Sequence, residues 1–306
     1  MEYPELVAEV ARLKHERDAV ILAHYYVPPE TQALADHVGD SFYLARLART
    51  LECSTIVLCG VSFMAESVKM LNPGRTVLLP EPTADCPMAH MVRKADVDAA
   101  RAAYDDLAVV CYINSTAEIK TWSDVCVTSA NAVKVVRELP QENILFIPDM
   151  HLGHYVSQLV PEKHFILNKG YCPIHHGMQV AEVKALKLTH PEAVVLAHPE
   201  CTEEVLAEAD YIGSTKQMID YVSKSDAAEF IVLTVEGVRR EMEHVSEGAD
   251  KRFYFPATTP VCADMARVTP ETVLEALRDG VGEVDMPANV ADATAPLELM
   301  LELAAR

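Results

Sequence analysis

Short apolar runs recur along the whole chain, and amphipathic segments separate them. The runs are rich in Val, Ile, Leu and Phe and are bounded by turn residues, which is typical of strands buried on both faces of a parallel sheet. We expect such strands near residues 19–26, 54–60, 76–80, 107–113, 143–149, 164–168, 193–199, 229–235 and 252–256. The intervening segments place apolar residues at helical spacing. Because strand and helix alternate throughout, the pattern predicts an α/β fold with parallel sheets.

The pattern also repeats three times along the chain. Matching residues recur at intervals of 85 to 90, at strand ends (His24, Tyr112, His198), at helix starts (Ser41, Ser129, Ser214) and in later loops (Cys86, Cys172, Cys262). We therefore predict three homologous α/β units, residues 1–86, 87–172 and 173–262, followed by a C-terminal helical tail at 263–306. Around a pseudo-threefold axis, the carboxyl ends of their strands would point at one centre, where parallel sheets bind ligands.

Seven of the eight cysteines fall into two groups. A lone cysteine is commonly a small buried hydrophobe. That description fits the cysteines within or beside apolar runs, which are Cys53, Cys59, Cys111 and Cys126. Cys86, Cys172 and Cys262 instead lie in loops after strands and repeat in register. Three converging thiolates suit a soft metal site, either zinc or an iron–sulfur cluster.

The segment "GYCPIHHG" at 170–177 keeps both kinds of metal open. Zinc would need a fourth ligand, and His175 could supply it. An iron–sulfur cluster held by only three cysteines would leave one iron free to bind a substrate atom as a Lewis acid. Spacing alone does not decide between these alternatives.

Polar residues flank the predicted centre in two further sets. The three serines at helix starts are explained by capping, but in register they would also form an anion cradle of hydroxyls and helix N–H groups. The strand ends carry pairs two residues apart, whose side chains point the same way: His24 with Tyr26, Tyr112 with Asn114, and His198 with Glu200. A histidine and a glutamate near an open metal would be natural acid–base groups.

Charge and hydropathy limit the partners and the compartment. The formal charge is -20, which argues against nucleic acid and anionic membranes as partners. No apolar run approaches the roughly 20 residues of a membrane span, and the N-terminus is charged and amphipathic. We expect a cytoplasmic protein whose thiols stay reduced.

Taken in order, these segments resemble the quinolinate synthase family along nearly the whole chain. The motifs that carry the resemblance are "HYYVPPETQALADHVGDS", "EPTADCPMA", "CYINSTAEIK", "CVTSANA", "GYCPIH", "AHPEC", "GST" and "VEG". The resemblance implies a [4Fe–4S] cluster on Cys86, Cys172 and Cys262. It also implies condensation of iminoaspartate with dihydroxyacetone phosphate to quinolinate, with loss of phosphate and water and no net redox change, for NAD synthesis. L-aspartate oxidase is the implied supplier of iminoaspartate.

The same resemblance implies roles for individual residues. The catalytic set would be Tyr26, His198 and Glu200. The substrate-binding set would be His24, Ser41, Tyr112, Asn114, Ser129, His198, Glu200, Ser214 and Thr215. The chain departs from the family where the first motif commonly reads "HYYQ", because residue 27 is valine, and at Met265, where some members carry a second cysteine.

Three other functions are weighed against this one. A diphthamide-synthase-like radical enzyme would share the three-unit architecture, but the "HYY", "GDS" and "HPE" segments speak against it. A non-enzymatic sensor carrying a cluster or zinc is disfavoured by the strong negative charge. A zinc hydrolase would need Cys and His ligands and would hold no labile sulfide.

Overall fold

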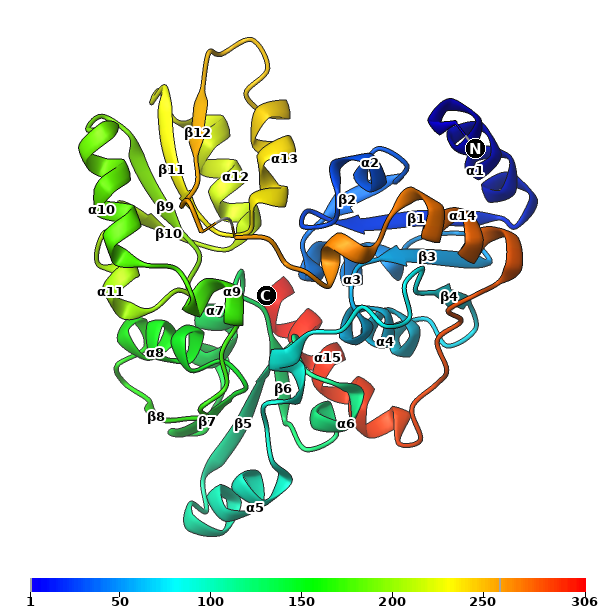
Figure 1. Cartoon of the computed structure of the whole chain (residues 1–306). Coiled ribbons are helices and arrows are strands. Elements are labelled where there is room, and N and C mark those ends of the chain that lie inside the picture. The colour runs from blue at the N-terminus through cyan, green and yellow to red at the C-terminus, as the bar shows by residue number, and fades with distance from the viewer. Residues whose placement is uncertain (1, 259) are drawn as a thin grey trace.

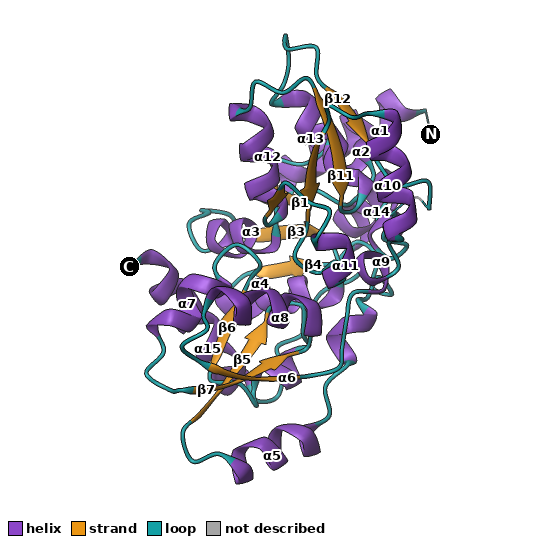
Figure 2. Ribbon diagram, turned by 90° about the vertical axis from the view of Figure 1, so that its left-hand side faces the viewer, coloured by secondary structure: helices purple, strands orange, loops and turns teal. Residues whose placement is uncertain are grey.

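The computed structural model describes residues 2–258 and 260–306, and its strands form three separate four-stranded sheets. Each sheet occupies its own lobe, and the lobes meet at the middle of the molecule (Figure 1). In Figure 2, the sheet of β9–β12 and the sheet of β5–β8 lie at opposite ends, with β1, β3 and β4 between them. We call these lobes the first, second and third units, in chain order.

The three sheets share one topology. Their strand orders are β2-β1-β3-β4, β6-β5-β7-β8 and β10-β9-β11-β12, and neighbouring strands pair in parallel. The first sheet comprises β1 (Ala19–His24), β2 (His37–Gly39), β3 (Thr55–Cys59) and β4 (Thr76–Leu78). The second comprises β5 (Leu107–Tyr112), β6 (Val125–Val127), β7 (Asn143–Ile147) and β8 (His164–Leu167). The third comprises β9 (Val194–Ala197), β10 (Tyr211–Ile212), β11 (Glu229–Leu233) and β12 (Arg252–Tyr254). The predicted α/β class with parallel sheets is confirmed.

Burial explains why the central strands read as continuous apolar runs. Every residue of β3 and β5 is buried, because helices cover both faces of a crossover-built parallel sheet. The helices of the first unit are α1 (Tyr3–Glu16), α2 (Pro29–Gln32), α3 (Ser41–Ala48) and α4 (Ser62–Leu71). Those of the second are η1 (Pro87–His90), α5 (Lys94–Ala103), α6 (Ala117–Lys120), α7 (Ala132–Glu138) and α8 (Met150–Leu159). Those of the third are α9 (Pro173–His176), α10 (Val180–Thr189), α11 (Glu203–Leu206), α12 (Thr215–Lys224), η2 (Glu236–Val238) and α13 (Arg239–His244).

The chain after the third sheet returns to the first two units. It forms η3 (Met265–Arg267), α14 (Pro270–Asp279) and α15 (Val290–Ala305). α14 packs on α1 and β3, whereas α15 packs on α4 of the first unit and on β6, α6 and α7 of the second. Helix α15, red in Figure 1, therefore connects the first and second units by packing against both. The unit boundaries at residues 86, 172 and 262 stay predictions. None of the helices in the described part of the chain combines the length and apolarity that a membrane span needs.

Candidate active site

One cavity lies where the three units meet. The predicted residues that line it are His24, Tyr26, Ser41, Cys86, Tyr112, Asn114, Ser129, Cys172, His198, Glu200, Thr215 and Cys262. They come from all three units and from the carboxyl ends of the strands, as the repeat predicted. Among the described lining residues there is no lysine or arginine.

Ser214 is the predicted site residue that does not line this cavity. It is buried at the N-cap of α12, where its hydroxyl accepts a hydrogen bond from the backbone N–H of Gln217. Its neighbour Thr215 takes the cavity position instead. The local capping explanation therefore accounts for Ser214.

The two strand-end histidines are fixed by the same local structure. The backbone N–H of Tyr26 donates to Nδ1 of His24 at 3.1 Å, and the N–H of Glu200 donates to Nδ1 of His198 at 3.4 Å. Each Nδ1 is thus an acceptor, so each neutral ring carries its proton on Nε2. Nε2 of His198 lies 3.2 Å from Oγ of Ser129. Burial lowers the pKa of His24 to about 4 and that of His198 to about 3, so both rings are neutral near pH 7.

This neutrality predicts how stability depends on pH. The folded pKa of His24 lies below the unfolded value of about 6.5, so the unfolded chain binds the extra proton first as pH falls. Metal-free wild-type protein should therefore lose between about 1 and 2 kcal/mol more stability than the metal-free His24→Gln variant when pH falls from about 7.5 to about 5. Urea unfolding of both proteins at the two pH values measures this difference. An equal loss in both would show that His24 is not buried in its neutral form.

A chain of hydrogen bonds links Tyr26 to Glu200. The hydroxyl of Tyr26 lies 2.8 Å from Oγ1 of Thr234, and Oγ1 of Thr234 lies 2.9 Å from Nε2 of His175. Nδ1 of His175 lies 2.7 Å from a carboxylate oxygen of Glu200. With the His175 proton on Nδ1, every contact has one donor and one acceptor: Tyr26 donates to Thr234, Thr234 to His175, and His175 to Glu200. Such a chain can relay a proton between a phenol and a carboxylate.

Glu200 is the charged centre of the cavity. Burial works to raise its pKa, but the neighbouring His198 and His175 and the hydrogen bonds from His175 and Tyr112 lower the pKa below its ordinary value. Burial raises the pKa of Tyr26 in spite of its bonds to Thr215 and Thr234, and burial also raises that of Tyr112. The site therefore holds the ionised carboxylate of Glu200 next to neutral phenols and the neutral imidazoles of His24 and His198.

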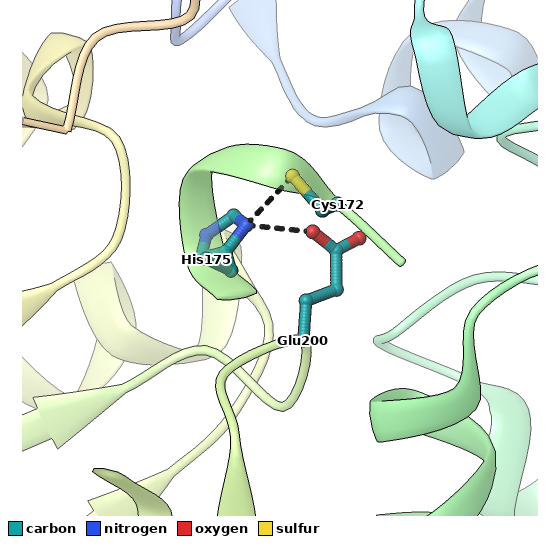
Figure 3. Close-up of side chains that lie close together, drawn as sticks. All are labelled: Cys172, His175 and Glu200. Atoms are coloured by element: carbon teal, nitrogen blue, oxygen red, sulfur yellow. Dashed lines mark hydrogen bonds and ion pairs between the residues drawn. The ribbon is translucent and has the colours of Figure 1, made fainter. Parts of the chain in front are cut away.

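His175 also touches one of the three cysteines. Its Nδ1 lies 3.2 Å from Sγ of Cys172, and the ligand atoms of Cys172, His175 and Glu200 lie within 4.8 Å of one another (Figure 3). Burial raises the pKa of all three cavity thiols, and the neighbouring thiols raise it further for Cys86 and Cys172. Bringing three thiolates together is therefore costly unless a metal centre offsets their charge. The cysteines predicted as structural, Cys53, Cys59, Cys111 and Cys126, are all buried and do not line this cavity.

Thr234 was missed by the sequence analysis, and His175 was left without a defined role there. Thr234 ends the apolar run at 229–235, and a threonine at a strand end carries no signal of its own. Its importance arises only because Tyr26, from the first unit, reaches the third. The apolar part of the cavity wall includes the side chains of Phe42, Phe63, Met88 and Val235, which the sequence analysis did not predict.

These features define a class: an α/β enzyme that encloses a small molecule between three parallel-sheet units, with acid–base groups at the strand ends. Comparisons with known proteins narrow the class. The family model described as "NadA: Quinolinate synthetase A protein" matches residues 8–302. The chain therefore belongs to the quinolinate synthase family, which serves NAD biosynthesis.

Individual relatives agree along the full length. The quinolinate synthase of Fusobacterium nucleatum is 49% identical over 296 residues, covering 96% of this chain and 98% of its own. That of Caldicellulosiruptor saccharolyticus is 44% identical and covers 99% and 100%. That of Aquifex aeolicus is 43% identical and covers 99% and 95%. Among solved structures, the E-1-hydroxy-2-methyl-but-2-enyl-4-diphosphate reductase from Plasmodium falciparum covers 90% of this chain at 11% identity, and its TM-score of 0.31 is too low to carry an argument.

Proposed function

We propose that the chain condenses iminoaspartate with dihydroxyacetone phosphate to quinolinate, releasing phosphate and water, with a [4Fe–4S] cluster held by Cys86, Cys172 and Cys262. The observation that supports this is the single cavity lined by one loop cysteine from each repeat together with all three strand-end pairs. L-aspartate oxidase is the class of enzyme that would supply the imine.

The donor set fits such a cluster. Three free thiols line one buried cavity, and burial and mutual repulsion keep them protonated until a soft cation is bound. The other sulfur atoms in the described cavity wall are the thioethers of Met88 and Met265, so no fourth thiolate is available there. When bound, the cluster would supply one iron with an open position, a Lewis acid for a substrate oxygen or nitrogen.

The residues of the chain itself hold the substrates and move protons. Without lysine or arginine in the wall, carboxylates and phosphate would be held by neutral donors, which are the hydroxyls of Ser41, Ser129 and Thr215, the amide of Asn114 and the Nε2–H of His24 and His198. Ser41 and Thr215 are the first residues of α3 and α12, where free backbone N–H groups add to the attraction for anions. Tyr112 donates to Glu200 and so orients the carboxylate in the cavity.

Tyr26 is the group we assign to proton transfer at the reacting carbon and oxygen atoms. A phenol with a raised pKa is a weak acid by itself, but its proton can pass through Thr234 to His175, while the ionised Glu200 stabilises the protonated ring. His198 and Glu200, from one strand end, would serve the dehydration step. The catalytic roles of Tyr26, His198 and Glu200 are part of this proposal.

Metal analysis with a turnover assay tests the proposal. Anaerobically isolated protein should contain about four irons and four sulfides per chain and should form quinolinate from the two substrates. The contact of Cys172, His175 and Glu200 offers a mononuclear zinc site as the alternative. Stoichiometric zinc, no labile sulfide and full activity would refute the cluster.

A further inference from the structure

Gln32 and Gly237, which the proposed mechanism does not use, contact each other beside the backbone of Tyr26. Gln32, at the end of α2, is buried, and Gly237 lies in η2, within the "VEG" segment after β11. The amide nitrogen of Gln32 lies 2.9 Å from the carbonyl oxygens of both Tyr25 and Val27, and 3.2 Å from that of Gly237. One side chain from the first unit thus binds the backbone on both sides of Tyr26 and the backbone of the third unit.

Gly237 leaves no space for a side chain at this junction. A Cβ atom on Gly237 would lie 2.7 Å from the carbonyl oxygen of Tyr25 and 2.8 Å from Cα of Tyr26, closer than real Cβ atoms come. Both neighbours are backbone atoms, which cannot rotate away. The close approach of the two units at this point therefore requires glycine.

The other end of Tyr26 is also held by the third unit. Its hydroxyl lies 2.7 Å from Oγ1 of Thr215 and 2.8 Å from Oγ1 of Thr234. The tyrosine belongs to the first unit by sequence, but the third unit contacts both its backbone and its hydroxyl. A shift of the third unit at Gly237 would therefore move the phenol relative to its two threonine partners.

We propose that Gln32 and Gly237 are positioning residues that set the hydroxyl of Tyr26 in the cavity. The Gln32 amide has two hydrogens for three carbonyl acceptors, so the bond to Gly237, the longest of the three, shares a hydrogen. Gln32 keeps the Tyr25–Val27 turn rigid, and Gly237 sets its distance from the third unit. The inference rests on the proposed role of Tyr26 in proton transfer.

A double-mutant cycle tests this inference. Gly237→Ala forces a backbone shift of several tenths of an ångström, and we expect kcat to fall about 10- to 100-fold while KM changes little. In a Tyr26→Phe background the same substitution should cost less than about twofold, because the positioned hydroxyl is already absent. Gly74→Ala is the matched control, since no atom lies within 4 Å of its Cβ. Gln32→Met, which removes the donors at similar volume, repeats the test without added bulk if Gly237→Ala fails to fold.

The outcomes distinguish the positioning role of Gln32 and Gly237 from the proposed proton-transfer role of Tyr26. If Gly237→Ala and Gln32→Met lower kcat by the same factor in both backgrounds, or leave it unchanged in both, the positioning role is wrong. If Tyr26→Phe alone keeps wild-type turnover, the proposed role of Tyr26 fails instead. Cluster absorption shows that every variant keeps its metal centre, and kinetics are measured well below the lowest thermal midpoint, so that every variant is folded in the comparison. Quinolinate affinity measured by equilibrium binding supplies a readout independent of turnover.

Discussion

Tyr26→Phe protein should fold, retain its metal centre and lose most of its turnover, by about 10²- to 10⁴-fold. The substitution removes only the hydroxyl, which is the first member of the chain through Thr234 and His175 to Glu200. The ring stays in place against His24, whose centroid lies 4.5 Å away. Two hydrogen bonds are lost, so we also expect a stability cost of roughly 1 to 3 kcal/mol. Steady-state kinetics under anaerobic conditions and urea unfolding measure the two effects.

Tyr25→Phe is the matched control for this variant. Tyr25 is adjacent and equally aromatic, and its side chain is buried in the third-unit core cluster instead of lining the cavity. Its turnover should stay near wild type. Wild-type rates in Tyr26→Phe protein would show that the proton-transfer role belongs to another group.

Cys172→Ser protein should lose most of its iron and sulfide, and with them its activity. A serine oxygen is a harder donor than a thiolate and binds the irons of a cluster poorly. The sulfur of Cys172 also has an imidazole beside it, since Nδ1 of His175 lies 3.2 Å away, and its backbone N–H donates to Asp149 at 3.2 Å. Iron and sulfide assays and the visible absorption of the anaerobic protein measure the loss.

Cys53→Ser serves as the control for this loss. Cys53 is buried outside the cavity, beside the first sheet, so its substitution should leave metal content unchanged. Retention of a full cluster by Cys172→Ser protein would contradict the ligand assignment. Loss in both variants would indicate a general effect of thiol removal on folding.

The sequence was sufficient for the fold class because the strands that form sheet centres are long, apolar and repeated. The strands it did not predict are β2, β6 and β10, each of two or three residues at a sheet edge. So short a segment cannot show a hydrophobic period, and its pairing is decided by the neighbouring central strand. The sequence also did not predict where the C-terminal tail packs, because the contacts of α15 with two units depend on three-dimensional proximity.

The site was predicted where residues repeat in register and missed where contacts cross between units. Register located the cysteines and the strand-end pairs, which all line one cavity. At one helix start, register pointed to Ser214, which caps α12, whereas the cavity is lined by Thr215, which only the family resemblance implied. Thr234 and Gly237 act through contacts with Tyr26 of another unit. Gln32 corresponds in register to Lys120, which is also buried at the end of a short helix and also donates to a backbone carbonyl, so register did not single it out. The roles of Thr234, Gln32 and Gly237 arise because Tyr26 of the first unit contacts the third unit, and no periodic pattern in the sequence predicts that contact.

The three strand-end pairs occupy equivalent places and yet differ in chemistry: imidazole and phenol, phenol and amide, imidazole and carboxylate. If the three pairs were identical, an asymmetric small molecule could bind in the cavity in three equivalent orientations. Only one of them would bring its reactive atoms to the right side chains. Because the three pairs differ, the cavity favours one orientation of an asymmetric substrate over the other two.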